Sequence, residues 1–148
     1  MTGTHRAIPE GYHTITPYLM VKGADSLVTF LQQAFGAREI HRMLRPDGGI
    51  WHAEMQIGDS KVMLTEACEQ MGTMPAALYL YVDDTDAIYR QALEAGASSL
   101  MEPADQFYGD RSAGIKDPYG NCWWIATHIE DVAPAEMEKR AYALAGKT

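Results

Sequence analysis

The sequence repeats itself once, and this repeat constrains the fold more than any other feature. The segment YLMVKGADSLVTFLQQAFGAREI, from Tyr18, resembles the segment YLYVDDTDAIYRQALEAGASSL, from Tyr79, at a period of about 60 residues. Each copy begins with an alternating strand that ends at Val21 or Val82, and a helix follows and ends before a Gly-Ala pair. Because there are only two copies, the pattern favours two fused units of strand, helix and three strands over a solenoid.

The repeat also predicts how the chain is organised. The first copy covers about residues 11–68 and the second about residues 76–129, and together they predict a single domain of the α+β class. Pro134 suits the first turn of a further helix over about 134–145, which lies outside the repeat. We expect this helix to cover a sheet edge or to pack on a partner.

The strands predict two chemically different sheet faces. In the first strand, Ile15, Leu19 and Val21 alternate with aromatic and amphipathic residues, so the aliphatic set should pack under a helix. In the first helix Leu27, Phe30, Leu31 and Ala34 lie at helical spacing and predict an apolar stripe, and in the second helix the predicted buried stripe is Ile88, Ala92 and Ala95. Polar side chains on one face of an apolar strand need water, one another or a ligand. The residues expected to line a ligand are Tyr18, Met20, His52, Glu54, Gln56, Tyr79 and Tyr81.

Composition excludes several classes of function. The net charge of −8 argues against nucleic acid as a partner, because a nucleic-acid binder needs a basic face. The longest apolar run, residues 76–82, is far shorter than the roughly 20 residues of a membrane span. The N-terminal residues contain no apolar signal-peptide core, and the two cysteines, Cys68 and Cys122, have no zinc spacing. We therefore expect a cytoplasmic protein without a membrane partner.

Four phrases in order carry a resemblance to a known family: ITPYLMV, FGARE, WHAEMQIGDSKVMLTE and DQFYGDRSAGIKDPYGNCWWIATHIEDV. They resemble the vicinal oxygen chelate superfamily, and within it the glyoxalase/bleomycin-resistance proteins of the PhnB-like branch. The resemblance implies two βαβββ modules that form an eight-stranded mixed, cup-shaped sheet. Ligands would bind the concave face, helices would cover the convex face, and the protein would be a homodimer.

The resemblance also identifies the positions that hold a divalent metal in other members. These positions fall on Thr16, on Val62 or Leu64, on Ala77 and on Trp124. Alanine, valine, leucine and tryptophan offer no lone pair that a divalent cation can use, and a neutral threonine hydroxyl is a poor ligand. We therefore expect no metal cofactor.

His52 and Glu66 match residues of the PhnB-like pattern and have three interpretations. His52 can hydrogen-bond Glu54, Gln56 or Glu66 as a satisfied polar cluster. Alternatively, His52 and Glu66 act as a catalytic acid/base pair next to a carbonyl, because histidine titrates near neutral pH. In the third interpretation the two are ligands of an atypical metal site, with Glu54 or His128 as additions.

Three further residues are candidates for ligand binding. Gln106 and Arg111 belong to the polar and aromatic phrase Asp105–Arg111, which crosses the mouth of the cup in the family. Arg111 can pair with Asp110 to hold the turn, or it can meet a ligand carboxylate. Trp124 can fill the core or stack on a ring, and since Trp123 points to the opposite face, at most one of them lines the cup.

Two functions follow. The first is a metal-independent protein that holds an amphipathic or aromatic small molecule in an aromatic-lined cup, without altering it. The alternative is a glyoxalase-like lyase or isomerase that uses His52 and Glu66.

Overall fold

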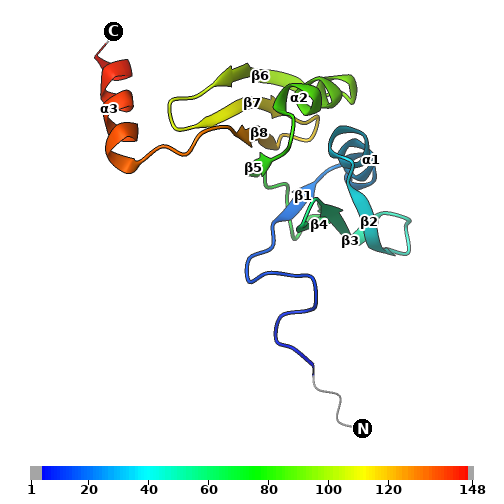
Figure 1. Cartoon of the computed structure of the whole chain (residues 1–148). Coiled ribbons are helices and arrows are strands. Elements are labelled where there is room, and N and C mark those ends of the chain that lie inside the picture. Colours follow the sequence, from blue (N-terminus) through cyan, green and yellow to red (C-terminus); the bar gives the residue numbers. More distant parts are fainter. Residues whose placement is uncertain (1–4, 147–148) are drawn as a thin grey trace. The chain divides into compact units, whose positions relative to one another are not determined.

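The chain divides after Ala76 into two units, each with its own sheet (Figure 1). The structure is a computed structural model that describes residues 5–146. Each unit has the element order βαβββ, and the second is followed by a further helix. This order confirms the predicted α+β class and the doubled module. The eight strands form two hydrogen-bonded sheets of four strands each.

Unit 1 contains β1 (Tyr18–Val21), α1 (Ala24–Phe35), β2 (Arg38–Leu44), β3 (Ile50–Ile57) and β4 (Ser60–Glu66). Its strand order is β1-β4-β3-β2, with β1 parallel to β4 and the other pairs antiparallel. The chain between the parallel strands β1 and β4 runs through α1, which crosses over the sheet, and then through the antiparallel strands β2 and β3. Glycine ends the helix as predicted: Gly36 adopts a left-handed conformation at the C-cap.

Unit 2 contains β5 (Ala77–Tyr81), α2 (Thr85–Glu94), β6 (Ser98–Asp105), β7 (Asp110–Lys116), β8 (Cys122–His128) and α3 (Pro134–Ala145). Its strand order, β5-β8-β7-β6, repeats that of unit 1, with β5 parallel to β8. The Asp84 side chain accepts a hydrogen bond from Ala87 N and so caps α2.

In each unit the core lies between the helix and one face of the sheet. In unit 1 the predicted apolar stripe of α1 is buried against this face, and Leu19, Ala53 and Leu64 beneath it are fully buried. In unit 2, Ile115 and Ile125 play the same part under α2. Burying one such large aliphatic side chain contributes about 1.5–3 kcal/mol, so this face defines how each strand is oriented.

Two details of the predicted faces are wrong. Ile15 is 85% exposed and lies outside β1, because Pro17 has no backbone N–H to donate and the strand begins only after it. The buried residues of α2 are Thr85, Tyr89 and Ala92. Tyr89 tolerates burial because its hydroxyl bonds Ser99 Oγ at 2.6 Å, so the stripe is displaced from Ile88 and Ala95.

Within residues 5–146, no helix has both the length and the apolar character needed to cross a membrane.

Candidate functional site

Each sheet has a face that carries no helix, which we call its open face. Because side chains alternate along a strand, the open face consists of the residues that alternate with those packed under the helix. In unit 1 the open face comprises Tyr18, Met20, His52, Glu54, Gln56, Lys61, Met63 and Thr65. In unit 2 it includes Tyr79, Tyr81, Asp110, Ser112, Gly114, Trp124, Ala126 and His128.

The open face of unit 1 collects five of the residues predicted to line a ligand. His52 Nε2 lies 3.3 Å from Glu54 Oε2, and the His52 ring meets the Tyr18 ring edge-on, with 5.9 Å between the ring centroids. Farther along β3, Gln56 accepts a hydrogen bond from Lys61 Nζ. Thus the polar residues of this strand lie close to one another and to the neighbouring strand.

Glu66 does not join this cluster. It ends β4 on the helix side, where its Oε1 accepts hydrogen bonds from Gly23 N at 3.1 Å and Ala24 N at 2.9 Å. Gly23 is the N-cap of α1 and has no side chain to satisfy the free N–H groups of the first turn, so Glu66 supplies the acceptor. The structure therefore does not bring His52 and Glu66 together as an acid/base pair or as ligands of one metal.

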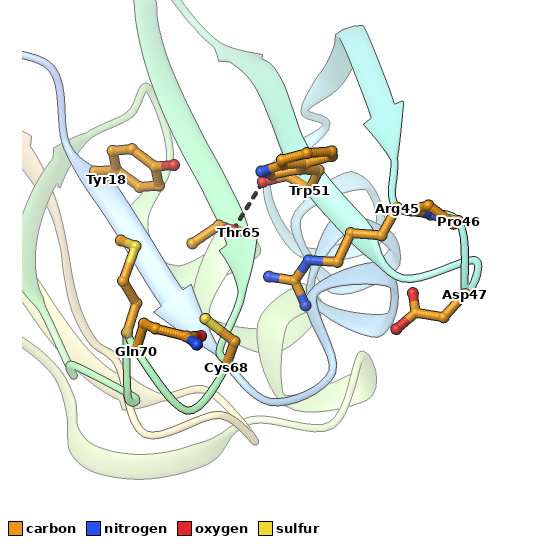
Figure 2. Close-up of a pocket in the computed structure, with 9 residues that line it drawn as sticks. Tyr18, Arg45, Pro46, Asp47, Trp51, Thr65, Cys68 and Gln70 are labelled. Atoms are coloured by element: carbon orange, nitrogen blue, oxygen red, sulfur yellow. Dashed lines mark hydrogen bonds between the residues drawn. The ribbon is translucent and has the colours of Figure 1, made fainter.

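A pocket of about 550 Å³ opens in unit 1 between the β2–β3 hairpin and the segment after β4. Its walls combine the aromatic rings of Tyr18 and Trp51 with the guanidinium of Arg45. Figure 2 shows Arg45 extending from the hairpin loop toward Thr65 and Cys68. Arg45 Nη2 donates to the Glu66 carbonyl at 2.6 Å, and Thr65 Oγ1 donates to the Trp51 carbonyl at 2.8 Å. The other lining residues are Pro46, Asp47, Gln70 and Met71.

In unit 2 the open face is organised around a buried carboxylate. Asp110, only 3% exposed, accepts hydrogen bonds at Oδ2 from the hydroxyls of Tyr79 (2.7 Å) and Tyr81 (3.0 Å). Its Oδ1 lies 2.9 Å from His128 Nδ1, and the other ring nitrogen of His128 lies 2.7 Å from Asp131. One carboxylate thus fixes both tyrosines and the histidine.

These contacts shift the pKa values of the four groups. Burial alone would raise the pKa of Asp110, but the hydrogen bonds from His128, Tyr79 and Tyr81 outweigh it and lower that pKa. The pKa of His128 is raised, first by Asp110 and then by Asp131. Burial and the bond to Asp110 raise the pKa of Tyr79, and the same bond is the main cause of the raised pKa of Tyr81. The cluster therefore favours a charged pair of Asp110 and His128 beside two neutral phenols.

Arg111 is not on the open face of unit 2. Its Nε lies 2.8 Å from Asp86 Oδ1 on α2, and its Nη1 lies 3.0 Å from Asp105 Oδ1. The predicted ion pair with Asp110 is wrong because neighbouring residues of a strand point to opposite faces. Gln106 lies half-buried in the β6–β7 turn, where its backbone N–H bonds the Asp110 carbonyl, and its role in ligand binding stays a prediction.

The two adjacent tryptophans of β8 do divide between the faces. Trp123 is 2% exposed on the helix side, and its Nε1 donates to Asp117 at 2.9 Å. Trp124 lies half-buried on the open face against Gly114, where an added Cβ would meet the indole at 2.4 Å. Glycine at this position lets the indole lie directly on the sheet.

The pairing of residues between neighbouring strands also shows where the positions that hold metal in other family members lie in this chain. Trp124 pairs with Tyr79 in unit 2, and the matching pair in unit 1 is Met63 with Tyr18. Met63 is therefore the counterpart of Trp124, whereas Val62 and Leu64 are buried on the helix side. A thioether is a soft, weak ligand, so the correction does not restore a site for a hard cation.

The remaining positions do not fit a metal either. Ala77, the exposed first residue of β5, and Thr16, half-buried before β1, give no strong donor. In residues 5–146, no three side chains of the metal-binding types converge. Asp110 and Asp131 do not chelate together, because they bond opposite nitrogens of His128.

Sequence reasoning missed Asp110 and the pocket residues Arg45, Trp51 and Thr65. For Asp110 a signal existed: strand alternation separates it from Arg111 and puts it on the face of Tyr79 and Tyr81. For the pocket no local signal existed, because its walls come from segments far apart in the sequence.

Comparison with known families identifies the class of protein to which this fold belongs. A family model of the glyoxalase/bleomycin resistance protein/dioxygenase superfamily matches residues 11–125, so the chain belongs to this superfamily. An uncharacterized protein of Mycobacterium bovis is 33% identical over 135 residues, covering 84% of this chain and 89% of the relative.

Solved structures show the same fold. One is a glyoxalase/bleomycin resistance protein/dioxygenase family enzyme from Burkholderia phytofirmans, with a TM-score of 0.64 and 23% identity over 76% of this chain and 95% of that chain. Another is a putative 3-demethylubiquinone-9 3-methyltransferase, PhnB protein, from Bacillus cereus, with a TM-score of 0.63 and 19% identity over 78% and 99% of the two chains. The predicted resemblance to the superfamily is thus confirmed.

Proposed function

We propose that this protein binds an amphipathic small molecule with an aromatic part, without a resident metal. The observation that carries the proposal is the pocket of unit 1. Its volume of about 550 Å³ is that of a small-molecule site, and it places two aromatic rings near one cationic group. Tyr18 and Trp51 supply flat apolar surface, and the Arg45 guanidinium has further N–H donors beyond the one that bonds Glu66.

This arrangement favours a ligand that carries an acidic group next to its aromatic part. A guanidinium binds carboxylate or sulfonate oxygens through parallel N–H groups, and a partly enclosed site strengthens that interaction. Binding needs no proton transfer and no polarised carbonyl. Glu66, which the enzyme hypothesis needs beside His52, accepts hydrogen bonds at the start of α1 instead. We therefore propose a binding protein rather than an enzyme.

The pocket can be tested with 8-anilinonaphthalene-1-sulfonate, which is aromatic and amphipathic and carries one sulfonate. We expect saturable binding, which the increase in dye fluorescence measures. Trp51→Ala should weaken it at least about tenfold, or ~1.4 kcal/mol, because the indole forms one wall. Arg45→Ala should weaken it similarly and Arg45→Lys less. The matched control is Arg38→Ala, an exposed arginine of β2 outside the pocket.

The same affinity in Trp51→Ala and in the parent protein would refute the pocket as the site. The melting temperature of each variant should match that of the parent protein, which shows that a weaker affinity does not come from a disrupted fold.

Metal independence has its own test. We expect freshly purified protein to contain no stoichiometric divalent metal by elemental analysis, and its melting temperature to shift by less than about 1 °C with EDTA. A stoichiometric metal together with a shift of several degrees would contradict the argument from Met63, Ala77 and Trp124.

A further inference from the structure

The open face of unit 2 carries a second constellation that the proposed function does not use. It lies where β7 begins and β8 ends, beside β5, and all its residues belong to unit 2. None of them lines the pocket of unit 1. Its members are Tyr79, Tyr81, Asp110, Ser112 and His128.

The two tyrosine rings are held together but not covered. Their centroids lie 5.2 Å apart with an angle of 54° between the planes, and both hydroxyls bond the same oxygen of Asp110. Tyr79 is nevertheless 46% exposed and Tyr81 62% exposed. Because the hydroxyls are tied down, ring surface rather than hydroxyl groups is what this face offers to a ligand.

The charge around the rings is negative. Asp110 and Asp131 flank His128, so a protonated His128 leaves one excess negative charge in this cluster. Lys116, the other cation on this face of β7, is six residues farther along the strand, about 20 Å away at the usual rise. Arg140 of α3 is paired with Glu130 and Glu136. Arg111 pairs with Asp86 on the helix side. A cation approaching the rings therefore meets attraction from the ring faces and from the carboxylates.

A small metal ion does not suit this place. His128 and the two tyrosines occupy three of the about four acceptor positions of the Asp110 carboxylate, so it can offer a hard cation one position at most. A large, weakly hydrated organic cation needs no such position, because it binds ring faces through cation–π attraction.

One polar atom on the same face lacks a partner. Ser112 is 1% exposed, and its Oγ makes no hydrogen bond within the described part of the chain. It lies on the same face of β7 as Asp110, two residues along, and its register partner Ala126 is also the partner of Tyr81. A buried hydroxyl without a partner costs free energy, so a ligand group that bonds it would recover that cost.

We propose that the pair Tyr79–Tyr81, backed by Asp110, binds an organic ammonium ion, with a quaternary or alkylated ammonium as the preferred group. This site shares no residue with the pocket of unit 1, so each can fail without the other.

The experiment compares choline with its uncharged carbon isostere, 3,3-dimethyl-1-butanol, by NMR titration of the full chain. The two probes share shape and hydroxyl and differ in charge. We expect saturable shifts of the Tyr79 and Tyr81 ring signals with choline, and at least tenfold weaker binding of the isostere. Equal affinity for the two probes, or no saturable shift with choline, would overturn the proposal.

Variants assign the site. Tyr81→Leu, which keeps apolar bulk but loses the ring, should weaken choline binding at least fivefold. Tyr81→Phe keeps the ring and should bind choline within about threefold of the parent. Trp51→Ala should leave choline binding unchanged, which separates this site from the pocket. If Tyr81→Leu binds choline as tightly as the parent protein does, the ring pair is not the site. The comparison of choline with its isostere uses only the parent protein, so it tests the proposal even if a variant does not fold.

Discussion

Asp110 accepts hydrogen bonds from Tyr79, Tyr81 and His128 although only 3% of it is exposed. A buried carboxylate is tolerated when each oxygen is hydrogen-bonded, and here the partners come from two other strands. The residue therefore joins β5, β7 and β8 at one point. Its chemistry is inseparable from that of His128, whose imidazolium balances it.

The raised pKa of His128 predicts how stability depends on pH. The folded state holds the proton on His128 more tightly than the unfolded state does, so this interaction stabilises fully below the unfolded-state pKa of about 6.5. The contribution is lost as pH rises through the folded-state pKa. We expect His128→Gln to reduce the free energy of unfolding more at pH 5.5 than at pH 9, measured by urea denaturation.

The control for this prediction is His13→Gln, which changes an exposed histidine in the segment before β1. A difference between parent and His128→Gln that is the same at both pH values would contradict the role of the charged pair.

At the scale of elements, α1 depends on a side chain far from it in the sequence. Its N-cap, Gly23, offers no side-chain acceptor, and Glu66 at the end of β4 takes the first N–H groups. The cap thus ties the start of the helix to the sheet on which it packs. This contact explains why a carboxylate stands at the end of an otherwise alternating strand.

We expect Glu66→Ala to lower the free energy of unfolding by about 1–2 kcal/mol, the usual range for loss of a helix cap with its charge. Glu66→Gln keeps an acceptor oxygen and should cost less. Both are measured by urea denaturation at pH 7, with Glu69→Ala, an exposed residue of the following loop, as the control. Equal losses for Glu66→Ala and Glu69→Ala would show that the cap contributes nothing.

Sequence patterns predicted the elements well because each module has local signals. Alternation gave the faces of β3 and β8, and helical spacing gave the buried stripe of α1. Register was harder. Two residues connect β3 to β4, whereas residues 117–121 connect β7 to β8, so the sequence predicted Val62 or Leu64 at the position where the strand pairing gives Met63.

The site was predicted in part for the same reason. Residues of one strand, such as His52 and Glu54, could be placed on one face from alternation alone. The partner of Glu66 lies 43 residues earlier in the chain, and the pocket needs a hairpin loop beside a distant segment. Such long-range contacts leave no periodic trace in a single sequence.

At the scale of the whole molecule, α3 stands out because no residue of it is buried. Tyr142 is 67% exposed and Leu144 51% exposed, and Arg140 ties the helix to unit 2 through Glu130 and the Phe107 carbonyl. A helix of 12 residues is marginal in water without an apolar partner. We therefore expect α3 to pack against a second copy of the chain.

This expectation predicts a homodimer, with twice the 16.4 kDa of the single chain by light scattering. Removal of the residues after Ala133 should give a monomer, and Tyr142→Ala combined with Leu144→Ala should weaken dimerisation. Exposed Glu94→Ala, on α2, is the control. The role of α3 would be contradicted if the full-length chain is a monomer, or if the truncated chain still forms a dimer that is as stable as the full-length one.

The positions of the three tryptophans have a practical consequence for spectroscopy. Trp51, 55% exposed, should emit at long wavelength and be quenched by acrylamide, whereas Trp123, 2% exposed, should emit at short wavelength and resist the quencher. Trp124 lies between these extremes on the opposite side of the same strand. Without any label, the quenchable part of the emission can report occupancy of the pocket, and the shielded part can report loss of the core of unit 2.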